Sequence, residues 1–167
     1  MVDFFKMLRK GSLSSVELLF SDPDYLKRVN PDFQKLVLDK RDHFVDTKRI
    51  LKSLNGLIFR EKVRIERGSS NPKSVVQALR IAYCGIWFLE DGIFHVDLRK
   101  KSETLRNQLL KIKFGQDKIP TKYPIGWLTD IDLEFQEKQK NRDISLDKSF
   151  DIEYCLEVVE GIYRKNI

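Results

Sequence analysis

The sequence predicts a mainly α-helical fold, a bundle of about six to seven helices with at most a short β-hairpin or strand near residues 93–98. Apolar residues recur every three or four positions along most of the chain, the spacing that lines one face of an α-helix. Glycine, proline and short polar clusters separate these segments, as expected for helix ends and turns. The composition, 41% hydrophobic and 34% charged, is typical of a globular protein.

Two short helices are expected at the start, over residues 3–10 and about 14–20, separated by a turn at Gly11. Ser14 or Ser15 could cap the second of them. Their apolar faces comprise Phe4, Phe5, Leu8, Val16, Leu18, Leu19 and Phe20.

A longer apolar pattern runs from Pro31 to about Arg67. Pro31 suits the first position of a helix capped by Asn30. A break near Val45–Asp46 divides the pattern into two helices, and a loop is expected over residues 68–72.

The strongest helix signal covers residues 73–90, where apolar side chains nearly encircle the axis. Such a helix is expected at the centre of the core. Residues 93–98 alternate and are rich in β-forming types, which predicts a short strand. Ser102 then opens another helix, which closes at Gly115.

Residues 116–127 contain two prolines and a glycine and are expected to be a linker. A capped helix start is expected at Thr129, an exposed connection over residues 136–149, and a final helix over residues 150–163. The residues expected to point inward from that helix are Ile152, Cys155, Leu156, Val159 and Ile162. Residues 1–115 would thus form one helical body, on which the linker and C-terminal helices of residues 116–167 pack.

The net charge of +6 is concentrated in the first two thirds of the chain. Residues 1–113 carry 23 Lys/Arg against 14 Asp/Glu, a balance of +9. This basic protein body favours phosphates or acidic surfaces as partners, with a solvated surface as the alternative. Two distant cysteines and two histidines show no metal-ligand spacing, so no metal site is expected. No apolar run matches a membrane span or a signal peptide, so no membrane partner and a cytoplasmic location are expected.

One carboxylate pair resembles a nucleotidyl-transfer signature by spacing. Polymerase-β-type enzymes use a Gly-Ser pair followed by Asp-x-Asp on a strand, which holds Mg²⁺. Here Gly11-Ser12 precedes Asp22 and Asp24. Pro23 disfavours a central strand between the carboxylates, and the spacer is predicted to be helical, so a turn is the preferred interpretation.

A second pair, Asp130 and Asp132, lacks the Gly-Ser partner. These carboxylates are interpreted as residues of a helix start.

Several segments, taken in order, resemble one enzyme family. They are residues 15–23, Asn30-Pro31, residues 40–44, residues 54–57, residues 71–80, residues 85–92 and residues 109–115. The series resembles the C-terminal helical half of RNA-repair-associated nucleotidyltransferases of the RlaP type, in the polymerase-β superfamily. The resemblance covers roughly residues 4–119, and the catalytic palm that precedes this half in the family is not found in the chain.

The resemblance implies a phosphate-contacting helix. The family's Lys-x-x-x-His-x-x-Arg pattern is matched by Lys73, Gln77 and Arg80, with glutamine in place of histidine. These three residues share a helix face, so nucleotide or phosphate contact is expected there, with an Arg80–carboxylate pair as the alternative. Arg60, Lys62, Arg64 and Arg67 form a further basic surface, interpreted as a solvated face.

Three functions follow from these patterns. The first is a nucleotidyltransferase-like, catalytically incomplete module that binds nucleotide or RNA and pairs with a palm-bearing partner or with a second copy. Exposed apolar residues Phe4, Phe5, Leu8 and Phe20 would motivate such pairing. The second is an active nucleotidyltransferase using Asp22 and Asp24, and only this one implies Mg²⁺ and a nucleoside triphosphate as cofactors. The third is a protein-interaction module of the inhibitor or immunity type.

Overall fold

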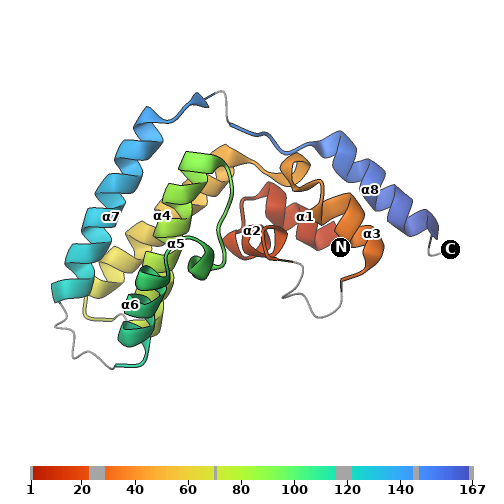
Figure 1. Cartoon of the computed structure of the whole chain (residues 1–167). Helices are drawn as coiled ribbons and strands as arrows, with labels where there is room; N and C mark the ends of the chain where they lie inside the picture. The colour runs from red at the N-terminus through yellow and green to blue at the C-terminus, as the bar shows by residue number, and fades with distance from the viewer. Residues whose placement is uncertain (1, 23–28, 70, 116–121, 145–146, 166–167) are drawn as a thin grey trace. The chain divides into compact units, whose positions relative to one another are not determined.

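The computed structural model describes residues 2–22, 29–69, 71–115, 122–144 and 147–165, and every regular element in these ranges is helical (Figure 1). The predicted mainly α fold is confirmed. The elements are α1 (Val2–Arg9), α2 (Leu13–Leu19), α3 (Pro31–Phe33), the π-helix η2 (Gln34–Leu38), the 3₁₀ helix η3 (Arg41–Phe44), α4 (Thr47–Glu66), α5 (Pro72–Asp91), the 3₁₀ helix η4 (Leu98–Lys100), α6 (Glu103–Lys113), α7 (Lys122–Asn141) and α8 (Ile152–Lys165).

The chain divides into two compact units. Met1–Ser53 and Ile144–Ile167 form the first, and Leu54–Asp143 forms the second. α8 therefore shares a unit with the first helices, and residue 115, where a boundary was expected from the sequence, lies within the second unit.

The first unit has its own aromatic core. Phe5 and Leu8 of α1 are buried, and the ring of Phe5 stacks on Phe44 at 5.1 Å between centroids. Phe20 is also buried, and half-buried Phe4 contacts the Phe33 ring. Phe5, Leu8 and Phe20 are therefore already buried within the first unit, so these side chains alone do not require a partner.

α8 packs with a face that is rotated from the expected one: Cys155 is buried as expected and Val159 and Ile162 are half-buried, but two of the expected residues are exposed. Cys155 and Val158 are buried, whereas Ile152 and Leu156 are 46% and 57% exposed. Tyr154 explains this rotation, since its hydroxyl donates to the Leu36 carbonyl at 3.1 Å and its ring stacks on His43. The inward face is set by these long-range contacts.

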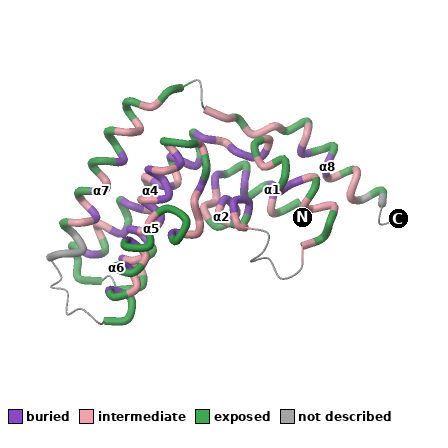
Figure 2. The backbone as a smooth tube through the Cα atoms, viewed as in Figure 1, coloured by how far each residue is buried: buried purple, intermediate pink, exposed green. Residues whose placement is uncertain are grey.

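The second unit is built around α5, which packs against α7 and α6. α5 itself carries buried residues on most of its sides, as its sequence predicts (Figure 2). They are Val75, Ala78, Leu79, Ile81, Ala82, Cys84, Gly85, Ile86 and Phe88. Gly85 permits close helix approach, because a Cβ there would lie 3.0 Å from both Leu54 and Phe135 side-chain atoms. α5 is thus the central element of this unit.

Two sequence expectations in this unit were wrong. Residues 93–97 contain no strand, because no second extended segment pairs with them in the described part of the chain. α7 runs from Lys122 to Asn141, so it includes part of the linker expected over residues 116–127 and part of the connection expected over residues 136–149, and Pro124 and Thr129 lie inside it. Residues 116–121 of that linker lie outside the described residues. Pro124 is tolerated because the first turn of a helix has no intrahelical N–H bonds to lose.

Candidate functional site

One face of α5 lines a cavity of about 310 Å³ in the second unit. Asn71 caps α5 by accepting a 2.9 Å hydrogen bond from the Ser74 amide, and Pro72 occupies the first helical position. Lys73, Gln77 and Arg80 then follow at intervals of four and three, so all three line the cavity. The structure therefore brings together the three residues that the sequence singled out.

α6 supplies the opposite wall of this cavity. Arg106 and Lys113 line it seven residues apart, which places them two turns apart on one face. Sequence reasoning missed both, although the Arg106–Leu109–Leu110–Lys113 spacing of α6 carries the signal. The pairing of α6 with α5 is what makes these two cations relevant.

Aliphatic side chains line the remainder of the cavity. They are Val76 of α5, Val96 and Leu98 of the segment between α5 and α6, and Leu109 and Leu110 of α6. Leu98 and Leu109 are buried, while the other three are half-buried. The cavity thus combines an apolar lining with charged side chains, the usual character of a small-ligand site.

The cavity is electropositive. Lys73, Arg80, Arg106 and Lys113 contribute four positive charges and Asp97 one negative charge, a balance of +3. Arg99 binds Asp97 through Nε at 2.9 Å and through its terminal nitrogen at 2.8 Å, which offsets that carboxylate. Gln77 accepts from Arg80 Nε at 3.3 Å and helps to orient the guanidinium.

The cations differ in exposure. Lys73 and Lys113 are exposed, whereas Arg80 and Arg106 are half-buried. Arginine suits the more enclosed positions because its guanidinium is weakly hydrated and matches a phosphate with two donors. The arrangement can bind an anion with an attached apolar group.

The second basic surface is largely engaged within the protein. Lys62 Nζ binds Asp132 at 2.8 Å, and Arg64 and Arg60 approach Glu61 at 2.9 and 3.7 Å. Arg67, exposed, follows the end of α4. Lys62, Arg64 and Arg60 thus have carboxylate partners within the protein, while Arg60, Arg64 and Arg67 remain exposed.

The Gly-Ser pair has a structural role in the fold. Gly11 is buried with φ +72° in the turn between α1 and α2, and Ser12 is the residue before α2. The spacer is helical over Leu13–Leu19, as predicted. Asp22 is half-buried, and Asp24 lies outside the described residues.

The second carboxylate pair lies within α7. Asp132 accepts from Lys62 and, at 3.2 Å, from Gln136, while Asp130 is exposed. The prediction of a helix start at Thr129 was therefore wrong, because Thr129 lies in the interior of α7. Across the part of the chain that the structure describes, no group of three or more His, Cys, Asp or Glu side chains could hold a metal ion.

An Arg80–carboxylate pair was the alternative to phosphate contact, with Glu90 or Asp42 as the carboxylate, and each of these two residues binds a lysine. Glu90 accepts from Lys138 at 2.6 Å, and Asp42 accepts from Lys148 at 2.7 Å. None of these four residues lines the cavity.

Comparisons with protein-family models, with curated proteins and with solved structures found no match to this chain. None of the described helices combines the length and the apolarity that a bilayer crossing requires.

Proposed function

We propose that this chain is a nucleotidyltransferase-like helical module that binds the phosphates of a nucleotide or RNA in the α5–α6 cavity. The observation that supports the proposal is the convergence of Lys73, Arg80, Arg106 and Lys113 on one partly apolar cavity. Two of these cations come from α5, where the family resemblance implies phosphate contact, and two come from α6, where it implies none. The proposal includes an accessory role beside a separate palm-bearing partner.

The chemistry of the cavity favours a phosphorylated ligand. Four cations within one cavity repel one another, and a bound polyanion relieves that repulsion. The volume of about 310 Å³ is at the lower end of the range for small-molecule sites, about 300–1,000 Å³. One nucleotide unit with its phosphates therefore fits better than an extended strand lying wholly inside.

A binding experiment with charge-matched variants tests the proposal. The double variant Lys73→Ala/Arg80→Ala removes two cavity cations, and Lys48→Ala/Lys52→Ala removes two exposed cations from α4. ATP without metal and a fluorescent single-stranded RNA are titrated by calorimetry and anisotropy. Only the cavity variant should lose affinity, by about tenfold or more, since each charged hydrogen bond contributes about 1.5–3 kcal/mol.

Salt dependence gives a second measure of the same contacts. For RNA, the slope of log affinity against log salt should become shallower by about 1.4 in the cavity variant, since each lost phosphate contact contributes about 0.7. Equal losses in both variants would show that binding follows net charge alone, and the site would then be rejected.

The same titrations separate the alternative functions. Mg²⁺-dependent ATP binding that is lost in Asp22→Ala and retained in the cavity variant would support an active nucleotidyltransferase. Absence of binding to both ligands would support a protein-interaction module.

A further inference from the structure

We propose that Asp91 is a positioning residue for the α5–α6 cavity, because it fixes the segment that forms one wall. This inference rests on the proposed phosphate-binding function and assigns a residue that determines the affinity of that site. We call residues 92–101 the wall segment. It connects the last residue of α5, Asp91, to the capping residue of α6, Ser102.

The wall segment supplies three cavity-lining residues, Val96, Asp97 and Leu98. Residues 93–97 belong to no helix or strand, so no regular backbone ladder holds them. Their position must come from contacts with the neighbouring helices, and the shape of the cavity depends on those contacts.

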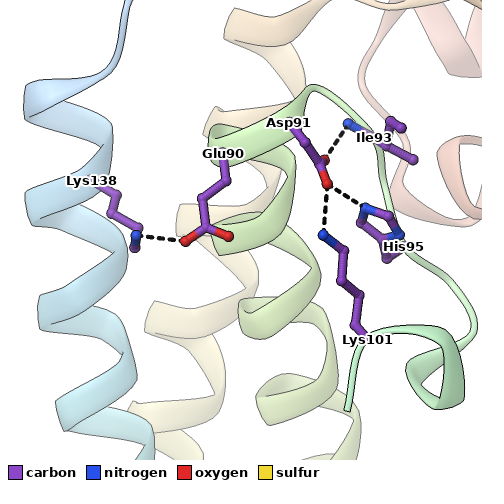
Figure 3. Close-up of polar contacts among 6 residues, drawn as sticks. All are labelled: Glu90, Asp91, Ile93, His95, Lys101 and Lys138. Atoms are coloured by element: carbon purple, nitrogen blue, oxygen red, sulfur yellow. Dashed lines mark hydrogen bonds and ion pairs between the residues drawn. The ribbon is translucent and has the colours of Figure 1, made fainter.

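One carboxylate ties both ends of the wall segment to α5 (Figure 3). Asp91 Oδ1 accepts from the Ile93 amide at 2.9 Å, near the start. Asp91 Oδ2 accepts from His95 Nε2 and from Lys101 Nζ, each at 2.7 Å. Because a carboxylate only accepts hydrogen bonds, His95 must carry its proton on Nε2 in this arrangement.

Further contacts place the middle of the wall segment against α5. Phe94 is fully buried, with its ring 6.2 Å from that of Phe88. The Cys84 thiol donates to the His95 carbonyl at 3.0 Å, and the Trp87 ring meets His95 edge to face. Apolar packing therefore holds Phe94, while Asp91 holds the two ends of the segment through the Ile93 amide and the Lys101 side chain.

The register of α5 links this contact to the phosphate site. Asp91 and Cys84 are seven residues apart, Cys84 and Arg80 four, and Arg80 and Gln77 three, so all four share one face. The wall segment returns along that face toward the start of α5, since His95 contacts Cys84 and Asp97 lines the same cavity as Arg80. Burial acts to raise the pKa of Asp91, but hydrogen bonds from Lys101 and His95 outweigh it and lower that pKa below 3.8.

The adjacent residue offers a matched control. Glu90 binds Lys138 of α7 at 2.6 Å, and Figure 3 draws no interaction between Glu90 and Ile93, His95 or Lys101. Asp91→Asn and Glu90→Gln each remove one negative charge and one lysine pair from the same end of α5. On charge alone, both substitutions should strengthen anion binding. Weaker binding by the Asp91→Asn variant would therefore be opposite to the effect of charge, and loss of the wall position explains it.

The experiment measures tripolyphosphate and ATP binding to the full chain by calorimetry, with amide hydrogen exchange over residues 93–101. Asp91→Asn should raise Kd about fivefold or more, as expected if the binding-competent wall is populated about one fifth of the time or less. It should also speed exchange at these amides. Glu90→Gln should leave Kd within about twofold and exchange in the wall segment unchanged, with both variants held well below their melting temperatures.

Each outcome separates the two proposals. If the wild-type chain binds neither ligand, the phosphate-binding function and the role of Asp91 both fail. If the wild type binds and Asp91→Asn binds equally well or more tightly, only the positioning role is overturned, whether or not exchange increases. A rise in Kd of the same size in Glu90→Gln would also overturn it, because the effect would then be general to this end of α5.

Discussion

His43 Nδ1 lies 2.9 Å from Asp151 Oδ2, a contact between residues 108 positions apart that joins η3 to the start of α8. The backbone reinforces it, since the Asp151 amide donates to the His43 carbonyl at 2.7 Å. Asp151 also caps α8 by accepting from the Tyr154 amide at 2.9 Å. The contact explains why α8 belongs to the first unit although it ends the chain.

Asp151→Ala should lower the melting temperature of the protein. The substitution removes both the cap of α8 and the acceptor for His43. Asp151→Asn keeps a capping oxygen and should lose less. Thermal unfolding followed by circular dichroism at pH 7 measures both, and an alanine variant that melts with the wild type would show that α8 is held by its apolar face alone.

Acid should destabilise the protein through Asp91 and Asp151. The pKa of Asp151 is lowered from 3.8 by hydrogen bonds from the Tyr154 amide and the His43 ring, and the pKa of Asp91 is also lowered. A lowered pKa in the folded state means that the unfolded chain binds protons first. The stabilisation is therefore complete above about pH 4 and is lost as pH falls through the folded-state values.

Melting temperatures between pH 7 and pH 2.5 test this dependence. The double variant Asp91→Asn/Asp151→Asn should start lower and fall less steeply below pH 4 than the wild type. Parallel curves for the two proteins would show that other carboxylates set the acid response.

Local signals in the sequence were sufficient to predict most helix starts. Asn30, Asn71 and Ser102 each accept a hydrogen bond from an amide two or three residues later, as capping rules require. These contacts lie within one turn of chain, so composition and order determine them. The glycines that end α1 and α5, Gly11 and Gly92, are local signals of the same kind, since both have φ +72°, a conformation that favours glycine.

Features that depend on distant partners could not be predicted in this way. The 93–98 pattern suits a strand, but Phe94 packs on α5 and no strand partner exists among the described residues. The cavity likewise needs α6 beside α5. The spacing of Arg106 and Lys113 is visible in the sequence, but only the packing of the two helices shows that both line the same cavity as Arg80. The role of Asp91 is visible only once His95 and Lys101 are placed.

Gly11→Ala should destabilise the first unit substantially. Its φ is +72°, and an added Cβ would lie 2.6 Å from the carbonyl oxygen of Arg49, a backbone atom that cannot move aside cheaply. The left-handed conformation alone costs about 1–2 kcal/mol. Urea unfolding should show a loss of at least about 2 kcal/mol once the clash is included.

Gly56→Ala provides the matched control for this substitution. Gly56 lies inside α4, is exposed, and has open space where the Cβ would be. Alanine there should raise the free energy of unfolding by about 0.5–1 kcal/mol, because glycine is the poorer helix former. If Gly11→Ala were as well tolerated, the turn would have to adopt another conformation, and the close contact with Arg49 would not be required.

Glu61 is a buried carboxylate whose removal should not harm stability. It is 4% exposed on the face of α4 that also buries Ile58 and Ile65. Oε1 accepts from Arg64 at 2.9 Å, but Oε2 is buried without a hydrogen-bond partner. Glu61→Met removes this desolvated charge and keeps apolar volume, so the free energy of unfolding should stay constant or rise by about 1–2 kcal/mol.

Arg64→Met should have the opposite effect, because it leaves the same carboxylate buried without its nearest donor. A loss of about 1–3 kcal/mol is expected. The double variant Glu61→Met/Arg64→Met should recover most of that loss, since no charge then remains to be paired. Urea denaturation of all four proteins measures the cycle. A loss above about 2 kcal/mol in Glu61→Met would contradict the argument, because such a loss requires that the carboxylate gain more from its contacts than its burial costs.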